Sequence, residues 1–167
     1  GTIRVSLTEA PEHEIPVAEL LVRHFAERPG IFPVLHPERY SPTEYRRRTN
    51  IQVPVVHSEP LDGFRVIEAV SGNPTAELRA AILNLDTPEP VVVKRRYEET
   101  SLETLAVKAA ADLGVLLLDG LADGIWIDAP GFAEEQVREI ELMILQAARV
   151  RFSHTEYIAC PSCGRTL

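Results

Sequence analysis

The pattern of hydrophobic and polar positions along the chain predicts short strands separated by longer helices. Residues 3–7 alternate apolar and polar side chains, as expected of a half-buried strand. Five more stretches have the apolar character of strands: 64–70, 91–95, 115–118, 125–128 and 156–159. The run 115–118 is wholly apolar, and a tight turn at 119–124 separates it from the next strand. The last predicted strand leads directly to Cys160.

Apolar residues at helical spacing lie between these strands. Pro16 suits the first turn of a helix that runs to about Glu27. Asn73-Pro74 supplies an N-cap and a first-turn proline for a second helix. The segment 100–103, Thr-x-x-Glu, is a capping box that opens a third helix, which Gly114 is expected to end. The predicted buried face of the first helix is Val17, Leu21 and Phe25, and that of the second is Leu78, Ile82 and Leu85. In the third helix it is Leu102, Leu105, Ala106, Ala109 and Leu113. A last helix is predicted to bury Val137, Ile140, Ile144, Ala147 and Ala148.

The region 29–60 has no such periodicity. It holds six prolines and is predicted to be an irregular surface loop with one extended piece at 51–56. Elsewhere, strands and helices alternate and the strands are apolar, which is typical of a mainly parallel sheet covered by helices. The sequence therefore predicts an α/β fold. The helices are too few for a complete eight-fold barrel, so we expect a partial barrel or an open sheet.

Composition limits the class of protein. The chain has 167 residues, of which 45% are hydrophobic, enough for one compact core and too few for three domains. A formal charge of −8 argues against nucleic-acid binding, which needs a surplus of Lys and Arg. The basic runs 46–48 and 94–96 are typical of solvated faces. We find no membrane-spanning apolar stretch and no secretory leader, so the cytoplasm is the expected compartment.

The pentapeptide 160–164, Cys-Pro-Ser-Cys-Gly, is the most informative motif. A tight turn at this spacing aims the thiolates of Cys160 and Cys163 at one point, and Gly164 allows the backbone to turn. The spacing alone favours zinc over a redox dithiol or an iron–sulfur cluster, and all three readings stay open. His154 is a candidate third ligand. Two thiolates do not close a site, so we expect the remaining ligands outside this chain.

Two further sets of polar residues are candidate sites. Arg4 and Ser6 lie on one side of the first predicted strand, near the end where parallel α/β proteins bind ligands, and they suit a phosphate. An exposed strand face is the alternative. Asp119, Asp123 and Asp128 resemble a carboxylate cluster for a hard cation, although Asp-Gly pairs are more often turn formers.

Three stretches together resemble one family, the hydroxymethylbutenyl diphosphate synthases of isoprenoid biosynthesis. The end, 155–167 (TEYIACPSCGRTL), resembles the start of the family's iron–sulfur domain. The opening, 2–9 (TIRVSLTE) with 14–16 (EIP), is similar to the segment that closes its substrate-binding barrel. The stretch 109–124 looks like the inserted middle domain of the three-domain form. The three stretches occur in the same order as in the family, and the match is weak between about residues 29 and 90.

The resemblance implies three parts: the end of the barrel at 1–28, the middle domain at 29–152 and the start of the iron–sulfur domain at 153–167. It implies that Cys160 and Cys163 bind a four-iron–four-sulfur (4Fe-4S) cluster, completed by a cysteine and a glutamate further along. It also implies that Arg4 and Ser6 contact the diphosphate of the substrate. The family reductively converts 2-C-methyl-D-erythritol 2,4-cyclodiphosphate to 4-hydroxy-3-methylbut-2-enyl diphosphate, with electrons from ferredoxin or flavodoxin.

We expect this chain alone to be inactive, because most of the barrel and of the cluster domain would lie outside it. The middle domain is then a spacer or dock between barrel and cluster. Exposed sheet edges allow self-association, for example as a homodimer. Two other functions remain open: a zinc-stabilised, non-catalytic interaction module, and a small phosphate-binding α/β enzyme that uses Arg4.

Overall fold

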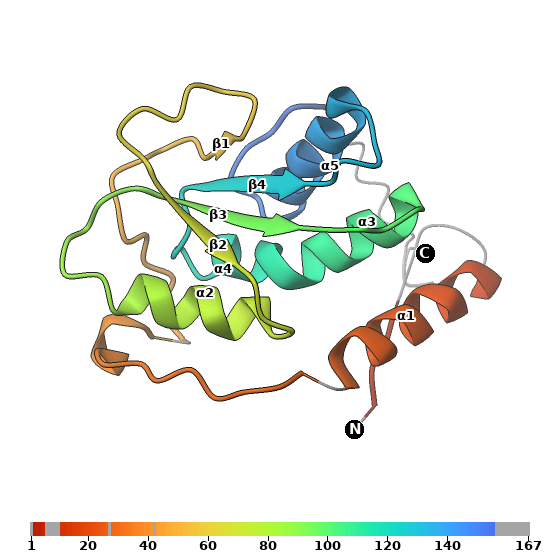
Figure 1. Ribbon diagram of the computed structural model, residues 1–167, viewed down its shortest axis with the longest axis horizontal. Coiled ribbons are helices and arrows are strands. Elements are labelled where there is room, and N and C mark those ends of the chain that lie inside the picture. The colour runs from red at the N-terminus through yellow and green to blue at the C-terminus, as the bar shows by residue number, and fades with distance from the viewer. Residues whose placement is uncertain (1, 6–10, 27, 42, 156–167) are drawn as a thin grey trace, which may run out of the picture.

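The computed structural model describes residues 2–5, 11–26, 28–41 and 43–155, and shows an α/β fold (Figure 1). The strands are β1 (Val55–Val56), β2 (Arg65–Ala69), β3 (Val91–Arg96) and β4 (Gly124–Asp128). The α-helices are α1 (Glu14–Ala26), α2 (Pro74–Leu83), α3 (Leu102–Ala109), α4 (Val115–Leu118) and α5 (Glu134–Ala147). A π-helical segment, Ala110–Gly114, joins α3 to α4, and short 3-10 helices span Pro11–His13 and Pro37–Arg39.

The four strands form one parallel sheet in the order β1-β4-β3-β2. The register places Ile67 beside Val93, and Val93 beside Ile125. Strands β2, β3 and β4 are neighbours in chain order, with α2 and then α3–α4 between them. This is the arrangement of successive βα units in a barrel, so the predicted α/β class and its partial barrel character agree with the structure.

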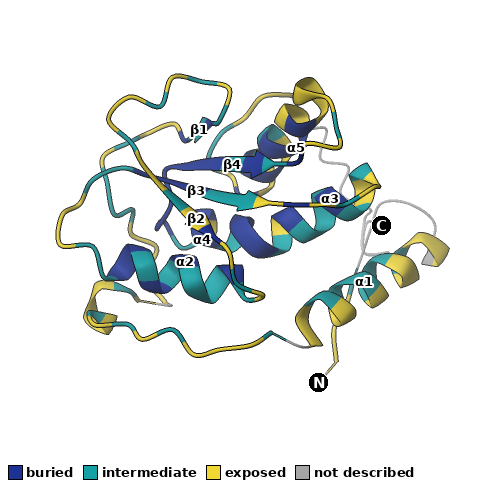
Figure 2. Cartoon of the chain, viewed as in Figure 1, coloured by how far each residue is buried: buried dark blue, intermediate teal, exposed yellow. Residues whose placement is uncertain are grey.

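The core lies on one face of the sheet, where α2, α3–α4 and α5 pack (Figures 1 and 2). Val93 and Ile125 point into this core together with Leu78, Leu105 and Ile144. The opposite face carries Val66, Glu68, Lys94 and Trp126, none of which is fully buried. There, Lys94 lies 4.5 Å from the centre of the Trp126 ring and 3.1 Å from Glu68 Oε2.

The prediction of a strand at 115–118 is wrong. These residues form α4, and Gly114 lies buried within a continuous helical stretch instead of ending it. A run of four apolar residues fits a buried helical turn as well as a strand, and periodicity cannot separate the two. Tertiary packing decides here, because Leu116 and Leu117 are buried against the common core.

The predicted starts of α2 and α3 agree with the structure more closely than the strand predicted at 115–118 does. The side chain of Asn73 caps α2 by accepting a hydrogen bond from Ala76 N–H, as predicted. The cap of α3 is Ser101, one residue after the predicted Thr100. Residues 2–5 form no strand, in contrast to the prediction for 3–7, while the strand predicted at 156–159 lies outside the described residues. In the described part of the chain, no helix has the length and apolar character needed to cross a membrane.

Candidate functional site

The residues that the sequence singled out for metal and phosphate lie mostly beyond the part of the chain that the structure describes. Cys160, Cys163 and Ser6 are outside it. Arg4 is exposed and is not part of a strand. His154 is also exposed, and its Nδ1 lies 2.9 Å from the hydroxyl of Ser153. The metal and phosphate ligands predicted from the sequence therefore stay predictions.

A buried polar group with several partners, Asp112, lies near the carboxyl edge of the sheet. Its carboxylate is completely buried. One oxygen lies 2.7 Å from His24 Nε2 and 2.5 Å from an Arg28 guanidinium nitrogen. The other accepts a hydrogen bond from the Tyr97 hydroxyl at 3.1 Å and lies 3.8 Å from Arg95 Nε. This set of partners compensates for the burial of the carboxylate. We call Asp112, His24, Arg28, Arg95 and Tyr97 the Asp112 junction.

The junction joins parts of the chain that are far apart in sequence. His24 belongs to α1 and Arg28 follows it, whereas Arg95 and Tyr97 come from the end of β3. Thr75, in the first turn of α2, accepts a hydrogen bond from Arg28 and donates one to the backbone carbonyl of Asp112. Asp112 itself lies in the π-helical segment, a geometry that occurs often at functional sites.

Tyr97 shows how strongly this environment differs from water. Burial raises the pKa of its phenol well above the usual 10, and the neighbouring Asp112 carboxylate adds to the effect. Tyr97 is therefore a neutral hydrogen-bond donor at physiological pH. Sequence reasoning missed the junction, because contacts across 84 and 88 positions leave no local pattern. The one available signal is a lone aspartate inside the apolar stretch 109–118.

The three aspartates considered for a cation do not form a cluster. Asp119 pairs with Arg79 and accepts from the Tyr40 hydroxyl. Asp123 accepts from the Val91 backbone N–H at 3.1 Å and pairs with Arg47 at 3.2 Å, and Asp128 faces Arg96. Among the residues that the structure describes, no group of three or more His, Cys, Asp or Glu side chains is placed to hold a metal ion. The hypothesis of a hard-cation site is wrong, because each carboxylate has an arginine partner.

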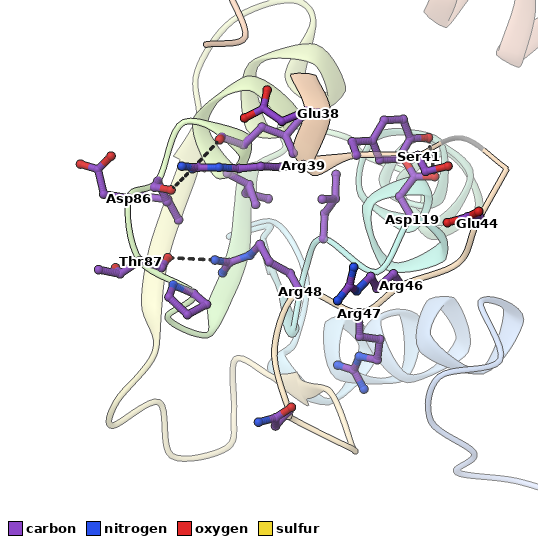
Figure 3. Close-up of a pocket in the computed structure, with 17 residues that line it drawn as sticks. Glu38, Arg39, Ser41, Glu44, Arg46, Arg47, Arg48, Asp86, Thr87 and Asp119 are labelled. Atoms are coloured by element: carbon purple, nitrogen blue, oxygen red, sulfur yellow. Dashed lines mark hydrogen bonds between the residues drawn. The ribbon is translucent and has the colours of Figure 1, made fainter. Parts of the chain in front are cut away.

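A cleft of about 720 Å³ opens beside the loop 37–50 (Figure 3). Arg39, Arg46, Arg47 and Arg48 line it together with acidic residues that include Glu38 and Asp119. Arg39 donates to the carbonyls of Leu83 and Leu85 at the end of α2, while Arg48 donates to those of Thr87 and Glu89 before β3. These hydrogen bonds attach the proline-rich loop to the end of α2 and to the segment before β3.

The cleft lies at the amino edge of the sheet, since the segments before β3 and β4 line it. Ligands of parallel α/β proteins bind at the opposite edge. Near that edge, the side chains of His24 and Arg28 contact Asp112, and Arg28 also bonds Thr75. The described region therefore has a polar junction near its carboxyl edge and a cleft at its amino edge, where Arg39, Arg47 and Arg48 are bonded to backbone carbonyls or to Asp123.

Comparison with known proteins shows one kind of protein to which the chain is similar. The chain is similar over 99% of its residues, at 34% identity, to the 4-hydroxy-3-methylbut-2-en-1-yl diphosphate synthase (flavodoxin) of Porphyromonas gingivalis. It spans 40% of that protein. Synthases of the same name match shorter stretches: that of Phocaeicola vulgatus is 46% identical over 108 residues and that of Parabacteroides distasonis 51% over 78 residues. No protein-family profile and no solved structure matches the chain.

The fold is α/β, and the similarity covers part of longer proteins. The chain spans about two fifths of the Porphyromonas gingivalis relative, and its matched stretches span 18% and 13% of the other two. The chain is a homologue of the 4-hydroxy-3-methylbut-2-en-1-yl diphosphate synthases, which confirms the resemblance drawn from its motifs. The match to the P. gingivalis protein extends over 234 positions, more than the 167 residues of this chain, so that relative has additional residues within the matched span.

Proposed function

We propose that this chain is the part of a 4-hydroxy-3-methylbut-2-en-1-yl diphosphate synthase that connects its substrate-binding barrel to its iron–sulfur domain. The similarity to proteins of that name over nearly every residue carries the proposal. Residues 1–28 then close the barrel, 29–152 form the inserted middle domain, and 153–167 begin the iron–sulfur domain. The whole protein reduces 2-C-methyl-D-erythritol 2,4-cyclodiphosphate to 4-hydroxy-3-methylbut-2-enyl diphosphate in the cytoplasm.

Cys160 and Cys163 supply two ligands of a 4Fe-4S cluster in this proposal. Thiolates are the ligands that such clusters require, and the C-x-x-C spacing places two of them on one centre. The cluster supplies the electrons for the reduction. Flavodoxin is the proposed donor in preference to ferredoxin, because the names of the relatives specify it. The remaining two ligands belong to sequence outside this chain.

Arg4 and Ser6 bind the substrate diphosphate in this proposal. A guanidinium forms two parallel, charge-assisted hydrogen bonds to phosphate oxygens, and a nearby hydroxyl adds a further donor. Arg4 is exposed in the structure, as a ligand-binding side chain must be before its ligand arrives. Neither residue transfers a proton or an electron, so their role is to bind and orient the substrate.

The region 29–152 has an architectural role. It has its own core on one face of a four-stranded sheet, and its buried carboxylates are paired with arginines or with backbone N–H groups. Val66 of the edge strand β2 is exposed, and so is Val70 directly after the strand. An exposed edge of this kind supports self-association, so we propose that the protein forms a homodimer, which sedimentation equilibrium tests directly.

Anaerobic reconstitution of the full-length protein with iron and sulfide tests the proposal. We expect a brown protein with broad visible absorbance that turns over the cyclodiphosphate when reduced flavodoxin is supplied. The 167-residue chain, assayed in parallel, is expected to show no turnover. A colourless full-length protein that holds stoichiometric zinc and shows no turnover would instead establish the interaction module.

A further inference from the structure

Helix α1 buries only part of its apolar surface. None of its residues, all of which are described, is fully buried (Figure 2). Val17, Leu20 and Leu21 are half-buried, whereas Ile15, Val22 and Phe25 keep 62%, 53% and 47% of their surface exposed. Amphipathic helices usually obtain most of their stability from a buried apolar face. For α1 this burial is partial, and polar contacts supply a further, specific attachment.

That attachment is the Asp112 junction at the C-terminal end of α1. His24 and Arg28 reach the buried carboxylate from the α1 side, and Arg95 and Tyr97 reach it from the β3 side. The Arg28 guanidinium also lies 3.8 Å from the centre of the Phe25 ring, so it contacts both α1 and Asp112. One buried carboxyl group is thus contacted from two separate parts of the chain.

The contacts around Arg28 define an orientation as well as an attachment. Arg28 bonds both Asp112 and Thr75, which lie on different helices, and Thr75 in turn bonds the Asp112 backbone. Just beyond it, Pro29 lies so close to Gly72 that a Cβ on that glycine would be 3.1 Å from the proline ring. A rotation of α1 about its end would therefore break several contacts at once.

We infer that Asp112 is a positioning residue that sets the orientation of α1 relative to the sheet. The consequence for activity rests on the proposed function. In the proposed synthase, α1 follows the substrate-binding barrel in the sequence, and the sheet precedes the domain that carries the cluster ligands. A fixed orientation of α1 then helps to place the barrel against that domain.

Pulsed electron spin resonance between two labels tests the orientation in the 167-residue chain. Glu19→Cys places one label on the exposed side of α1, and Glu139→Cys places the other on exposed α5, in a Cys160→Ser, Cys163→Ser background. We expect one narrow distance distribution. The double variant His24→Ala, Arg28→Ala is expected to lose the narrow peak. Arg23→Ala is the matched control, because Arg23 is on the same helix and its side chain is 73% exposed.

Hydrogen exchange on the same variants separates release of α1 from unfolding of the sheet. Release predicts faster exchange for the amides of α1 and unchanged protection for β3 and β4. An unchanged distance distribution in the double variant overturns the inference. Loss of protection in β3 and β4 also overturns it, because the junction would then be a general element of core stability.

The full-length protein tests the link to activity. We expect the double variant to retain the visible absorbance of its cluster while kcat falls about tenfold or more, since small misplacements of reacting groups are costly. Arg28→Lys keeps the charge but loses the paired hydrogen-bond geometry, so its kcat is expected to lie between those of the parent and the double variant. An unchanged kcat overturns the link to activity. A wild-type protein without synthase activity overturns the proposed function and leaves the distance result standing.

Discussion

Three carboxyl groups are buried among the described residues, and each accepts hydrogen bonds from an element other than its own. Asp112 joins α1 to the end of β3. Asp123 accepts from the first residue of β3, and Glu141 of α5 accepts from β4. At the scale of single residues, these groups carry the strongest testable consequences, because a buried polar group is costly when it loses its partners.

Glu141 bonds a part of β4 that β1 does not reach. Strand β1 pairs with Gly124 and Ile125 of β4 and ends before Ile127. Glu141 Oε1 accepts a hydrogen bond from that N–H at 2.7 Å, whereas Oε2 is buried without a partner. Burial is the largest influence and raises the pKa of Glu141 from 4.5 to about 8. The side chain is therefore protonated in the folded protein at neutral pH.

This pKa predicts that the contribution of Glu141 to stability falls as the pH rises from 4.5 to about 8. In that window the folded state holds a proton that the unfolded state has released, so unfolding releases it. The contribution of Glu141 to the free energy of unfolding is greatest below the window and falls by at most about 1.4 kcal/mol per pH unit within it. Urea unfolding across this pH range measures the slope.

Glu141→Gln should flatten that slope, because the amide oxygen still accepts from Ile127 and no longer ionises. The variant should therefore exceed the parent in stability at the alkaline end. Glu139→Gln, on the exposed side of the same helix, is the matched control and should keep the parent's slope. Parallel pH profiles for the parent and Glu141→Gln would contradict the assignment.

Asp123 joins the loop before β1 to the start of β3. Its side chain accepts from Val91 N–H, pairs with Arg47 and accepts from Thr49. Asp123→Ala should lower the free energy of unfolding by about 3 kcal/mol, because it leaves the N–H and the cation without their acceptor. Asp123→Asn, which keeps an acceptor, should lose less. Urea unfolding measures both, and exposed Asp62→Ala should change little. Equal losses of unfolding free energy in Asp123→Ala and Asp62→Ala would refute the stabilising role of Asp123.

At the scale of elements, Gly124 controls the pairing of three strands. It opens β4 between β1 and β3, and a Cβ there would lie 2.8 Å from methyl groups of both Val55 and Val92. Gly124→Ala should therefore lower the free energy of unfolding by about 1–3 kcal/mol through overpacking. Exposed Gly131 has only an ordinary contact at 3.7 Å, so Gly131→Ala should change stability by less than about 0.5 kcal/mol. A Gly124→Ala variant as stable as its parent in thermal unfolding would refute this.

The helical stretch from α3 to α4 shows where element-level prediction reaches its limit. The spacing of Leu105, Ala109 and Leu113 identifies the helix correctly, and Leu105, Ala109 and Leu113 are all buried. The π-helical segment then changes the period, so the four apolar residues after Gly114 no longer fit the pattern of the preceding turns. A change of period inside a helix has the same appearance in sequence as a change of element.

At the scale of the whole molecule, the cysteine motif decides the proposed chemistry. In the full-length protein, Cys160→Ser or Cys163→Ser should abolish the visible absorbance of the cluster and the turnover, because a hydroxyl is a poor replacement for a thiolate ligand of iron. Ser162→Ala is the matched control within the same turn and should retain both. Absorbance spectra with iron analysis after anaerobic reconstitution measure the outcome. Full turnover in either serine variant would remove that cysteine from the ligand set.

The sequence by itself determined what depends on local pattern. Alternating apolar strands and capped helices predicted the α/β class, and Asn73-Pro74 located the start of α2 to the residue. The motifs near both ends were sufficient to indicate the synthase family, which comparison then confirmed. Each of these features depends on residues that are neighbours in the chain, where spacing alone carries the information.

Only the tertiary structure decided which polar groups meet. It paired Asp112 with His24 and Arg28, assigned each of Asp119, Asp123 and Asp128 its own arginine, and buried Glu141 against Ile127. It also made a helix of 115–118 by packing Leu116 and Leu117 into the core. The physical reason is the same in each case. The free energy of a buried charge or an apolar run depends on partners brought near by folding, and a single sequence does not record those partners.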